Sequence, residues 1–550
     1  MRGPPVLRSA PRVTYQAVGF HQRIHTGALM KYHQNERENM SDWSAGYVSD
    51  IGYTYGYYHE LNPLRARLAL LNAGFVCPEV GTACELGFGQ GLSANIHAAG
   101  LQGQWHGTDF NPSQAAYAQE LAAASGSDAL LHDEAFADFA RRPDLPDFDF
   151  IGLHGIWSWI SDENRSVIAD FVRRKLKVGG VLYISYNTLP GWAAFAPMRH
   201  LMTRHAEVIG AEGHGIVRRI NGALEFTEKL LATNPAYLRV NPQIADRLKA
   251  IKDQNRHYLA HEYFNRDWHP MHFGTMAEWL EPAKVTYACS AGFLDHVDLL
   301  NLTQEQQAFL AEIPDAMFRE STRDFMVNQQ FRRDYWVKGP RKLSGLEQVE
   351  AVRAQRVVLT SHRPDISLKV TGALGEATMS EAVYAPILDL LSDHKPKALG
   401  QIEQALQGQN VNLAQVRQAS MLLAGAGHLT PVQEDAQVAK ARRHTDKLNA
   451  RLIGLARSSN DVGYLASPVT AGGVTASRFH QMFLLALGQG RKQPAEWAQF
   501  AWQILAAQGQ SLIKEGKGLP TPEENLAELT AQAKTFAEKQ LPLLRALQIA

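Results

Sequence analysis

The fold of this chain is decided by the stretch Ala83-Cys84-Glu85-Leu86-Gly87-Phe88-Gly89-Gln90-Gly91. Residues 82–86 are a short, mostly apolar run between two glycines, which predicts a buried strand. Gly87, Gly89 and Gly91 then alternate, and glycine suits a sharp turn that a ligand approaches closely. Helix-forming residues follow. The sequence therefore predicts a strand, a glycine turn and a helix, against which a nucleotide-like cofactor can bind.

An acidic residue directly before the turn indicates which cofactor fits. A dinucleotide site has the spacing G-x-G-x-x-G and faces a pyrophosphate, whereas this chain has G-x-G-x-G behind Glu85. The Glu85 carboxylate would repel a pyrophosphate and favours a cofactor with a positive end. A second acid, Asp109, stands about twenty residues beyond the glycines, where a carboxylate can bind both ribose hydroxyls. We expect both acids, with the neighbouring Phe110, to contact the cofactor.

The segments around this unit alternate between expected strands and expected helices. The strands fall at 82–86, 104–109, 129–132, 148–153 and 180–186, and the helices at 91–99, 112–124 and 162–176. Such alternation predicts an α/β fold with a mostly parallel sheet and helices on both faces. Ligands bind at the carboxyl ends of the strands in these sheets. His154 and Trp157 follow the fourth strand, so we expect them in the wall of the site.

The sequence motifs together resemble those of a known enzyme family. The residues are Glu85 to Gly91, Asp109, the His154 segment and the tip Tyr186-Asn187-Thr188-Leu189-Pro190-Gly191-Trp192. They are similar to bacterial class I S-adenosylmethionine (SAM) methyltransferases that carry a methyltransferase regulatory domain, a group that includes outer-membrane-protein lysine methyltransferases. The segment His261-Glu262-Tyr263-Phe264-Asn265, followed by Trp268 and Pro270, looks like that regulatory domain.

The resemblance implies a complete fold and an activity. It implies a Rossmann-like sheet of seven strands, with the sixth strand at 284–289 and an antiparallel seventh strand at 331–337. It also implies that SAM is the cofactor and that a methyl group passes to an acceptor, for which a protein lysine side chain is the expected choice. Lysine has a pKa near 10.4, so only about one side chain in 10³ is neutral at pH 7. Aromatic walls would help to desolvate its ammonium group.

Strand ends and resemblance together give the expected site residues. For the cofactor they are Glu85, Gly87, Gly89, Gly91, Asp109, Phe110, Asp133 and His154. Asp133 follows the third strand, where such folds hold the adenine amino group, but a solvated loop acid fits the sequence equally well. For the substrate they are Tyr53, Tyr55, Trp157, Asn187 and Trp192, of which the two tyrosines belong to an aromatic run with Tyr47, Tyr57 and Tyr58. Tyr186 and His154 are the candidates for a general base. We expect no metal, because His261-Glu262 lacks the second histidine of H-E-x-x-H.

Composition excludes several other classes of protein. The 55 Lys and Arg residues equal the 55 Asp and Glu residues, so charge favours neither nucleic acid nor a membrane surface. The three cysteines lack metal or redox spacing and suit a reducing, cytoplasmic location. No apolar run approaches about 18 residues, so we expect no membrane span.

Shifts of pattern along the chain indicate six parts. They are a tail or wrongly assigned start at 1–39 with Met40 as the alternative start, a SAM-binding core at 40–209, a helical regulatory insert at 210–283, the return of the core sheet at 284–340, a winged-helix-like domain at 341–435 and a helical C-terminal domain at 436–550. The winged-helix-like part is not conspicuously basic, which favours docking to a protein over DNA. The last helix, 522–547, is expected either to close its domain or to form a homodimer.

Three other functions fit parts of the sequence. The first is a small-molecule methyltransferase whose extra domains only oligomerise. The second is a protein that binds SAM without catalysis and uses its winged-helix-like part to interact. The third, an NAD enzyme, is disfavoured by Glu85 and the glycine spacing. A protein acceptor is preferred because the large C-terminal half suits a macromolecular substrate.

Overall fold

The computed structural model describes residue 47 and residues 51–211 and 213–550. The expected tail at 1–39 and the alternative start at Met40 lie outside the described residues. In the part of the chain that is described, no helix is long and apolar enough to span a bilayer.

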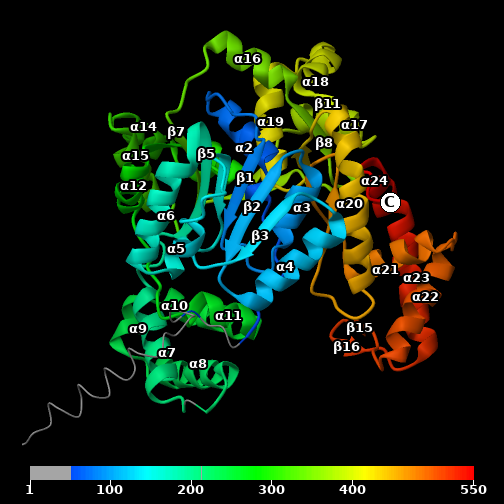
Figure 1. Cartoon of the computed structure of the whole chain (residues 1–550), viewed down its shortest axis with the longest axis horizontal. Coiled ribbons are helices and arrows are strands. Elements are labelled where there is room, and N and C mark those ends of the chain that lie inside the picture. The colour runs from blue at the N-terminus through cyan, green and yellow to red at the C-terminus, as the bar shows by residue number, and fades with distance from the viewer. Residues whose placement is uncertain (1–46, 48–50, 212) are drawn as a thin grey trace, which may run out of the picture. The chain divides into compact units, whose positions relative to one another are not determined.

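A seven-stranded sheet lies at the centre of the fold, with the strand order β3-β2-β1-β4-β5-β7-β6 (Figure 1). The strands are β1 Thr82–Leu86, β2 Gln104–Asp109, β3 Ala129–Asp133, β4 Phe148–Leu153, β5 Leu176–Asn187, β6 Val285–Ser290 and β7 Phe331–Lys338. The first five are parallel, and β7 runs antiparallel to both β5 and β6. This topology confirms the predicted methyltransferase-type sheet, including its antiparallel seventh strand.

Helices cover both faces of the sheet, as the alternating pattern predicted. They are α2 Pro63–Asn72, α3 Leu92–Gly100, α4 Pro112–Ser125, α5 Phe136–Phe139 and α6 Asp162–Lys175. The start of α4 follows from its sequence, because the Asn111 side chain accepts a hydrogen bond from the Ser113 N–H at 3.0 Å and Pro112 fills the first turn. The start of α3 at Leu92 places its first turn directly behind the glycines.

The chain between β5 and β6 is helical, as expected. It contains α7 Ala196–Val208, α8 Ile216–Ala232, α9 Ala236–Val240, α10 Gln243–Lys252, α11 Arg256–Tyr263 and α12 Phe273–Leu280. Helices α7, α8, α10 and α11 share an apolar core of their own, which includes Trp192, Phe195, Met202, Ile220 and Leu259. Between β6 and β7 lie α13 Asp298–Asn301, α14 Gln304–Ala311 and α15 Ala316–Met326.

A second, smaller sheet follows the core. Its antiparallel order is β11-β8-β12. The elements of this region are α16 Gly345–Ala354, β8 Arg356–Leu359, β9 Lys369–Gly372, β10 Gly375–Thr378, α17 Glu381–Leu391, β11 Lys397–Ala398, α18 Leu399–Leu406, α19 Leu413–Gly425 and β12 Leu429–Pro431. The comparison of this region with a winged helix stays a prediction.

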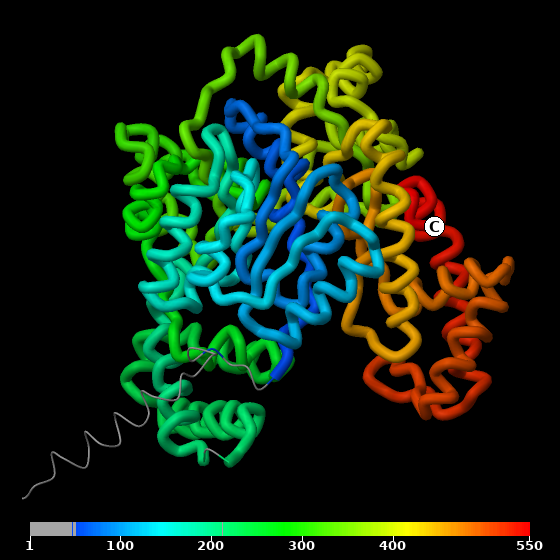
Figure 2. The backbone as a smooth tube through the Cα atoms, viewed as in Figure 1, coloured from blue at the N-terminus to red at the C-terminus, as the bar shows by residue number. Residues whose placement is uncertain are grey.

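The C-terminal part is mainly helical and packs on the core (Figures 1 and 2). It contains α20 Asp435–Leu455, β13 Tyr464–Ser467, β14 Gly472–Thr475, α21 Arg478–Gly488, α22 Pro494–Ala507, β15 Ile513–Lys514, β16 Lys517–Gly518, α23 Pro522–Thr535 and α24 Leu541–Ala546. Helix α20 lies against α3 and α4. The Asn62 side chain donates to the carbonyls of Thr470 and Ala471 at 3.1 and 3.3 Å, so buried hydrogen bonds also join the two parts.

Candidate active site

The glycine turn after β1 has a backbone that only glycine adopts without strain. The φ angles are +73° at Gly87, +57° at Gly89 and +68° at Gly91. A Cβ at Gly91 would lie 2.4 Å from the Cβ of Ala118 on α4, whereas the nearest atom to a Cβ at Gly89 would be 3.5 Å away, on Tyr53. Gly91 therefore lets the turn pack closely against α4. At Gly89 the turn has room for a Cβ on the side that faces Tyr53.

Asp109, at the end of β2, holds the glycine turn in place. Its carboxylate accepts hydrogen bonds from the N–H groups of Gly89 at 2.8 Å and Asn111 at 3.0 Å. Burial raises the pKa of Asp109 to about 7, and the nearby Asp133 charge adds to the rise, although both N–H donors oppose it. The predicted ribose-binding acid thus lies directly beside the glycines.

Glu85 brings a second buried carboxylate to the same turn. It is 3% exposed, and its Oε2 has no hydrogen-bond partner among the described residues. Burial raises the pKa of Glu85 to about 8, with a further contribution from the charge of Asp109. An unpartnered buried carboxylate is costly unless a ligand supplies a cation or a donor. The acids Glu85 and Asp109 therefore suit a cofactor with hydroxyls and positive charge.

Phe110 and Asp133 extend this group of residues. Asp133 is the direct partner of Asp109 in the β2–β3 pairing, and its side chain is exposed. Phe110 contacts the ring of Tyr47 edge-on, with 5.7 Å between ring centroids. The pKa of Tyr47 is raised mainly by burial and then by the charge of Asp109. The ends of β1, β2 and β3 thus carry all the predicted cofactor residues except His154, which follows β4.

Helix α11 and the segment before α2 contribute further residues beside the glycine turn. The Tyr53 hydroxyl donates to Glu262 Oε1 at 3.4 Å, and the Tyr53 ring meets His261 edge-on at 5.0 Å. His261 also contacts Tyr47, at 5.3 Å between ring centroids. Glu262, Tyr47 and Tyr58 were not among the predicted site residues. The aromatic run pointed to the tyrosines, but no sequence signal linked Glu262 to residues two hundred positions earlier.

His154 lies in the wall of this site. Its ring stacks on Tyr58, with 3.7 Å between centroids and 18° between planes, and its Nδ1 is 2.7 Å from the Tyr183 hydroxyl. Burial lowers the pKa of His154 to about 4, so the imidazole is uncharged at neutral pH. The Tyr58 N–H donates to Ser93 Oγ of α3 at 2.8 Å, which fixes the stacked pair beside the glycine turn.

Tyr186 and Trp157 are not brought to this site. Both are fully buried. The Tyr186 hydroxyl donates to Asp334 Oδ2 at 3.0 Å, and the Trp157 indole N–H points to Met271 Sδ at 3.4 Å. Residues alternate between the two faces of a strand, so Tyr183 and Ser185 point toward the His154 loop while Tyr186 points to the opposite face.

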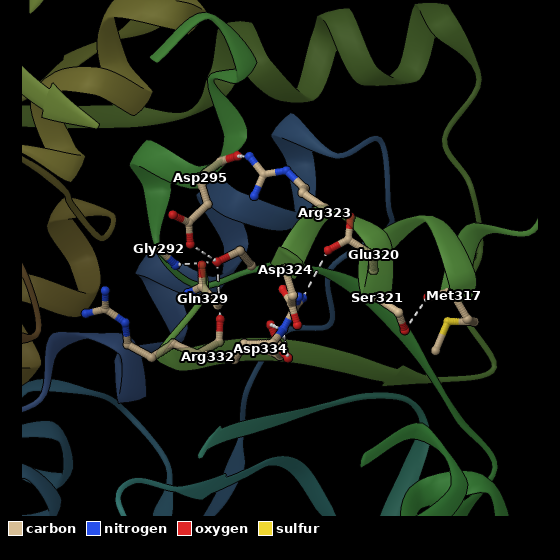
Figure 3. A network of polar contacts seen from close by, with 12 residues as sticks. Gly292, Asp295, Met317, Glu320, Ser321, Arg323, Asp324, Gln329, Arg332 and Asp334 are labelled. Carbon is tan, nitrogen blue, oxygen red and sulfur yellow. Dashed lines mark hydrogen bonds and ion pairs between the residues drawn. The ribbon is translucent and has the colours of Figure 1, made fainter. Parts of the chain in front are cut away.

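On that opposite face, Asp334 belongs to a buried ionic network (Figure 3). Arg332 donates to Asp334 at 2.9 Å, to Asp324 at 2.6 Å and to Glu320 at 3.0 Å. The guanidinium also lies 4.3 Å from the centroid of the Phe273 ring. This network fixes β7 to α12 and α15. Through Asp334 it also binds the Tyr186 hydroxyl, so the contact of Tyr186 is a structural one.

The remaining predicted substrate residues have partners on other elements. Tyr55 contacts Tyr117 of α4, at 5.1 Å between ring centroids, and packs in the apolar cluster of the C-terminal helices. Asn187 Oδ1 accepts a hydrogen bond from the Trp192 indole at 2.9 Å, and the Arg247 guanidinium lies 3.9 Å from the Trp192 ring centroid. Asn187 and Trp192 therefore connect the end of β5 to the helical insert.

Within the described ranges, no group of three or more His, Cys, Asp and Glu side chains is arranged to hold a metal ion. The histidines of the insert have other contacts. His257 Nδ1 lies 2.9 Å from the Gly52 carbonyl, and His261 Nε2 lies 3.0 Å from the Ile51 carbonyl. These two histidines connect α11 to the segment before α2.

The chain is similar to known proteins over most of its length. A family model described as "Predicted methyltransferase regulatory domain" matches residues 255–338. "Uncharacterized protein sll1526" of Synechocystis sp. is 40% identical over 512 residues, which cover 92% of this chain and 99% of the relative. "Uncharacterized protein RP789" of Rickettsia prowazekii is 26% identical over 186 residues, 34% of this chain and 33% of that protein.

The fold is also similar to a solved structure. PKMT2 from Rickettsia typhi, determined in complex with AdoHcy, has 17% sequence identity and a TM-score of 0.66, over 88% of this chain and 98% of that chain. At this identity the similarity shows the shared fold. The match at residues 255–338 places α11, α12 and the last two strands of the sheet in the regulatory domain, which confirms the predicted family resemblance.

Proposed function

This chain belongs to the family of the Synechocystis protein sll1526 and carries a methyltransferase regulatory domain, and on that premise we propose that it is a SAM-dependent methyltransferase. The observation that carries the proposal is the pair of buried acids at the glycine turn. Glu85 and Asp109 lie at the ends of neighbouring parallel strands, and both carboxylates are almost completely buried. Two carboxylates at this turn would repel a pyrophosphate, so they favour a cofactor that has none.

SAM fits the residues present. It carries a sulfonium and an ammonium group, and when bound it supplies a methyl group on positively charged sulfur. Asp109 would accept hydrogen bonds from the ribose hydroxyls, and the unpartnered Glu85 oxygen suits the charged part of the cofactor. The AdoHcy in the PKMT2 structure is what remains of SAM after methyl transfer, and that protein shares this fold. We extend the proposed cofactor site to Phe110, Asp133 and His154.

For the acceptor we propose a protein lysine side chain. Glu262 and the rings of Tyr53 and Tyr58 lie beside the glycine turn, and such a group of side chains favours a cationic ligand. The long C-terminal part favours a macromolecular acceptor over a metabolite. The three cysteines are free, which supports the proposal of a cytoplasmic location.

One experiment separates this function from its alternatives. The purified protein is incubated with methyl-labelled SAM and a cell extract, and the label is then separated into protein, metabolite and unreacted SAM. Label on protein lysines supports the proposal, whereas label on a metabolite indicates a small-molecule methyltransferase. Binding of SAM by calorimetry without transfer to either pool would indicate a SAM-binding interaction protein instead.

A further inference from the structure

We propose that Glu262, on helix α11 of the regulatory domain, forms a subsite for the acceptor's ammonium group together with Tyr53 and Tyr58. The regulatory domain would then contribute a residue that contacts the substrate. This inference rests on the proposed function and specifies which residues receive the acceptor.

The geometry places Glu262 next to the open part of the glycine turn. Its Oε1 accepts the hydrogen bond from the Tyr53 hydroxyl, and the Tyr53 ring in turn lies 3.5 Å from the position of a Cβ at Gly89. The Glu262 backbone carbonyl accepts a hydrogen bond from the Trp159 indole at 3.3 Å. Helix α11 is thus fixed both to the segment before α2 and to the loop after β4.

The charges near Tyr58 point to a cationic ligand. Burial raises the pKa of Tyr58 to about 12, the hydrogen bond with Tyr53 opposes the rise, and the carboxylate charges of Glu262, Glu85 and Glu60 add to it. Glu60 is neutralised by Arg333 at 2.7 Å. Glu262 forms no ion pair with any described residue, whereas Glu85 is assigned to the cofactor. Glu262 therefore lies beside the tyrosines without a counter-ion in the described part of the chain, and a primary ammonium would supply the missing charge.

The same arrangement can accept a proton. A lysine ammonium would transfer one proton to the Glu262 carboxylate, which becomes a neutral carboxyl, and the nitrogen keeps the electron pair with which it accepts the methyl group. Burial raises the pKa of Glu262 to about 7, closer to neutral pH than the lowered pKa of His154. The titratable groups that interact with the Glu262 charge are Tyr47, Tyr53 and Tyr58 from the segment before α2, and Tyr258 and Tyr263 on its own helix.

The test is peptide binding to the full-length protein saturated with AdoHcy. The probes are a peptide with one lysine and the same peptide with norleucine in its place, both measured by calorimetry. We expect the wild type to bind the lysine peptide more tightly, and we expect Glu262→Gln to reduce that preference by about 10- to 100-fold. The control is Glu225→Gln, which removes an exposed acid on α8 and should keep the preference. Circular dichroism of each variant checks its fold.

Each result of this experiment either supports or overturns the Glu262 subsite. Equal binding of the two peptides by the wild type, or an unchanged preference in a folded Glu262→Gln variant, would overturn the subsite. A loss of SAM affinity in Glu262→Gln would also overturn it, because Glu262 would then belong to the cofactor site. If the wild type binds neither SAM nor AdoHcy, the proposed function itself fails, and that separate measurement shows it. With a methylated acceptor in hand, the acid limb of the kcat–pH profile should be displaced in Glu262→Gln.

Discussion

Glu85 and Asp109 lie at the ends of neighbouring parallel strands, close enough that the charge of Asp109 helps to raise the pKa of Glu85 to about 8. Asp109 is held by two backbone N–H groups, but one oxygen of Glu85 has no partner among the described residues. The ligand-free protein therefore carries an uncompensated acid at its glycine turn.

Replacing Glu85 by glutamine should stabilise the ligand-free protein. The folded protein keeps a proton on Glu85 that the unfolded chain releases above the ordinary value of 4.5, so the free energy of unfolding falls as the pH rises from about 4.5 to about 8. Glu85→Gln lacks this loss, and its advantage should be larger at pH 8 than at pH 5. We expect a gain of about 1–3 kcal/mol at pH 8 from denaturant melts. A variant less stable than the wild type at both pH values would contradict the unpartnered acid.

Two glycine variants should separate the cost of backbone strain from the cost of a close packing contact. Gly91→Ala combines a positive φ with a contact of 2.4 Å to Ala118, whereas Gly89→Ala has a positive φ without such a contact. We expect Gly89→Ala to lose about 1–2 kcal/mol of stability and Gly91→Ala to lose clearly more. Thermal melts measure both. Equal losses in the two variants would show that the contact between Gly91 and α4 does not matter.

Removing Arg332 should destabilise the region around β7. Arg332→Leu would leave Asp324, Asp334 and Glu320 without their shared cation, and breaking a buried ion pair in this way costs about 3–5 kcal/mol. The matched control is Arg353→Ala, which removes an exposed partner of Glu403 and should leave the unfolding free energy nearly unchanged. Urea melts of both variants make the comparison, and similar stabilities would argue against the network of Figure 3.

Tyr186 offers a test of where catalysis takes place. Because its hydroxyl is buried and bonded to Asp334, Tyr186→Phe should lower stability by about 1–2 kcal/mol but leave kcat for methyl transfer within a few-fold of wild type. Tyr53→Phe removes the hydroxyl that contacts Glu262 and should affect transfer more. If Tyr186→Phe remained folded but lost transfer, Tyr186 would regain its role as a candidate base.

Local sequence signals were enough to predict the first five strands and the glycine turn, whereas the sixth strand and the antiparallel seventh strand came from the family resemblance. The strand before Gly87, the acid at position 109 and the proline-started helix after Asn111 each depend on neighbouring residues alone. The face to which a strand residue points is harder to predict, and so Tyr186 was grouped with His154 although the two side chains lie on opposite faces of the sheet.

Contacts between distant parts of the chain could not be predicted. Glu262 meets Tyr53 only because α11 packs against the segment before α2. Tyr55 belongs to the same aromatic run as Tyr53, but its ring packs toward the C-terminal helices instead. The segment that holds these tyrosines is irregular, so its sequence has no periodicity that predicts where each ring points. The neighbours of each ring are set by tertiary packing.

The central claim is that Asp109 and the glycine turn bind SAM, and calorimetry of SAM binding tests it most directly. Asp109→Ala should weaken binding by about 1.5–3 kcal/mol, roughly 10- to 150-fold, while the exposed control Asp128→Asn should bind as the wild type does. An unchanged SAM affinity in a folded Asp109→Ala variant would contradict the proposed cofactor site.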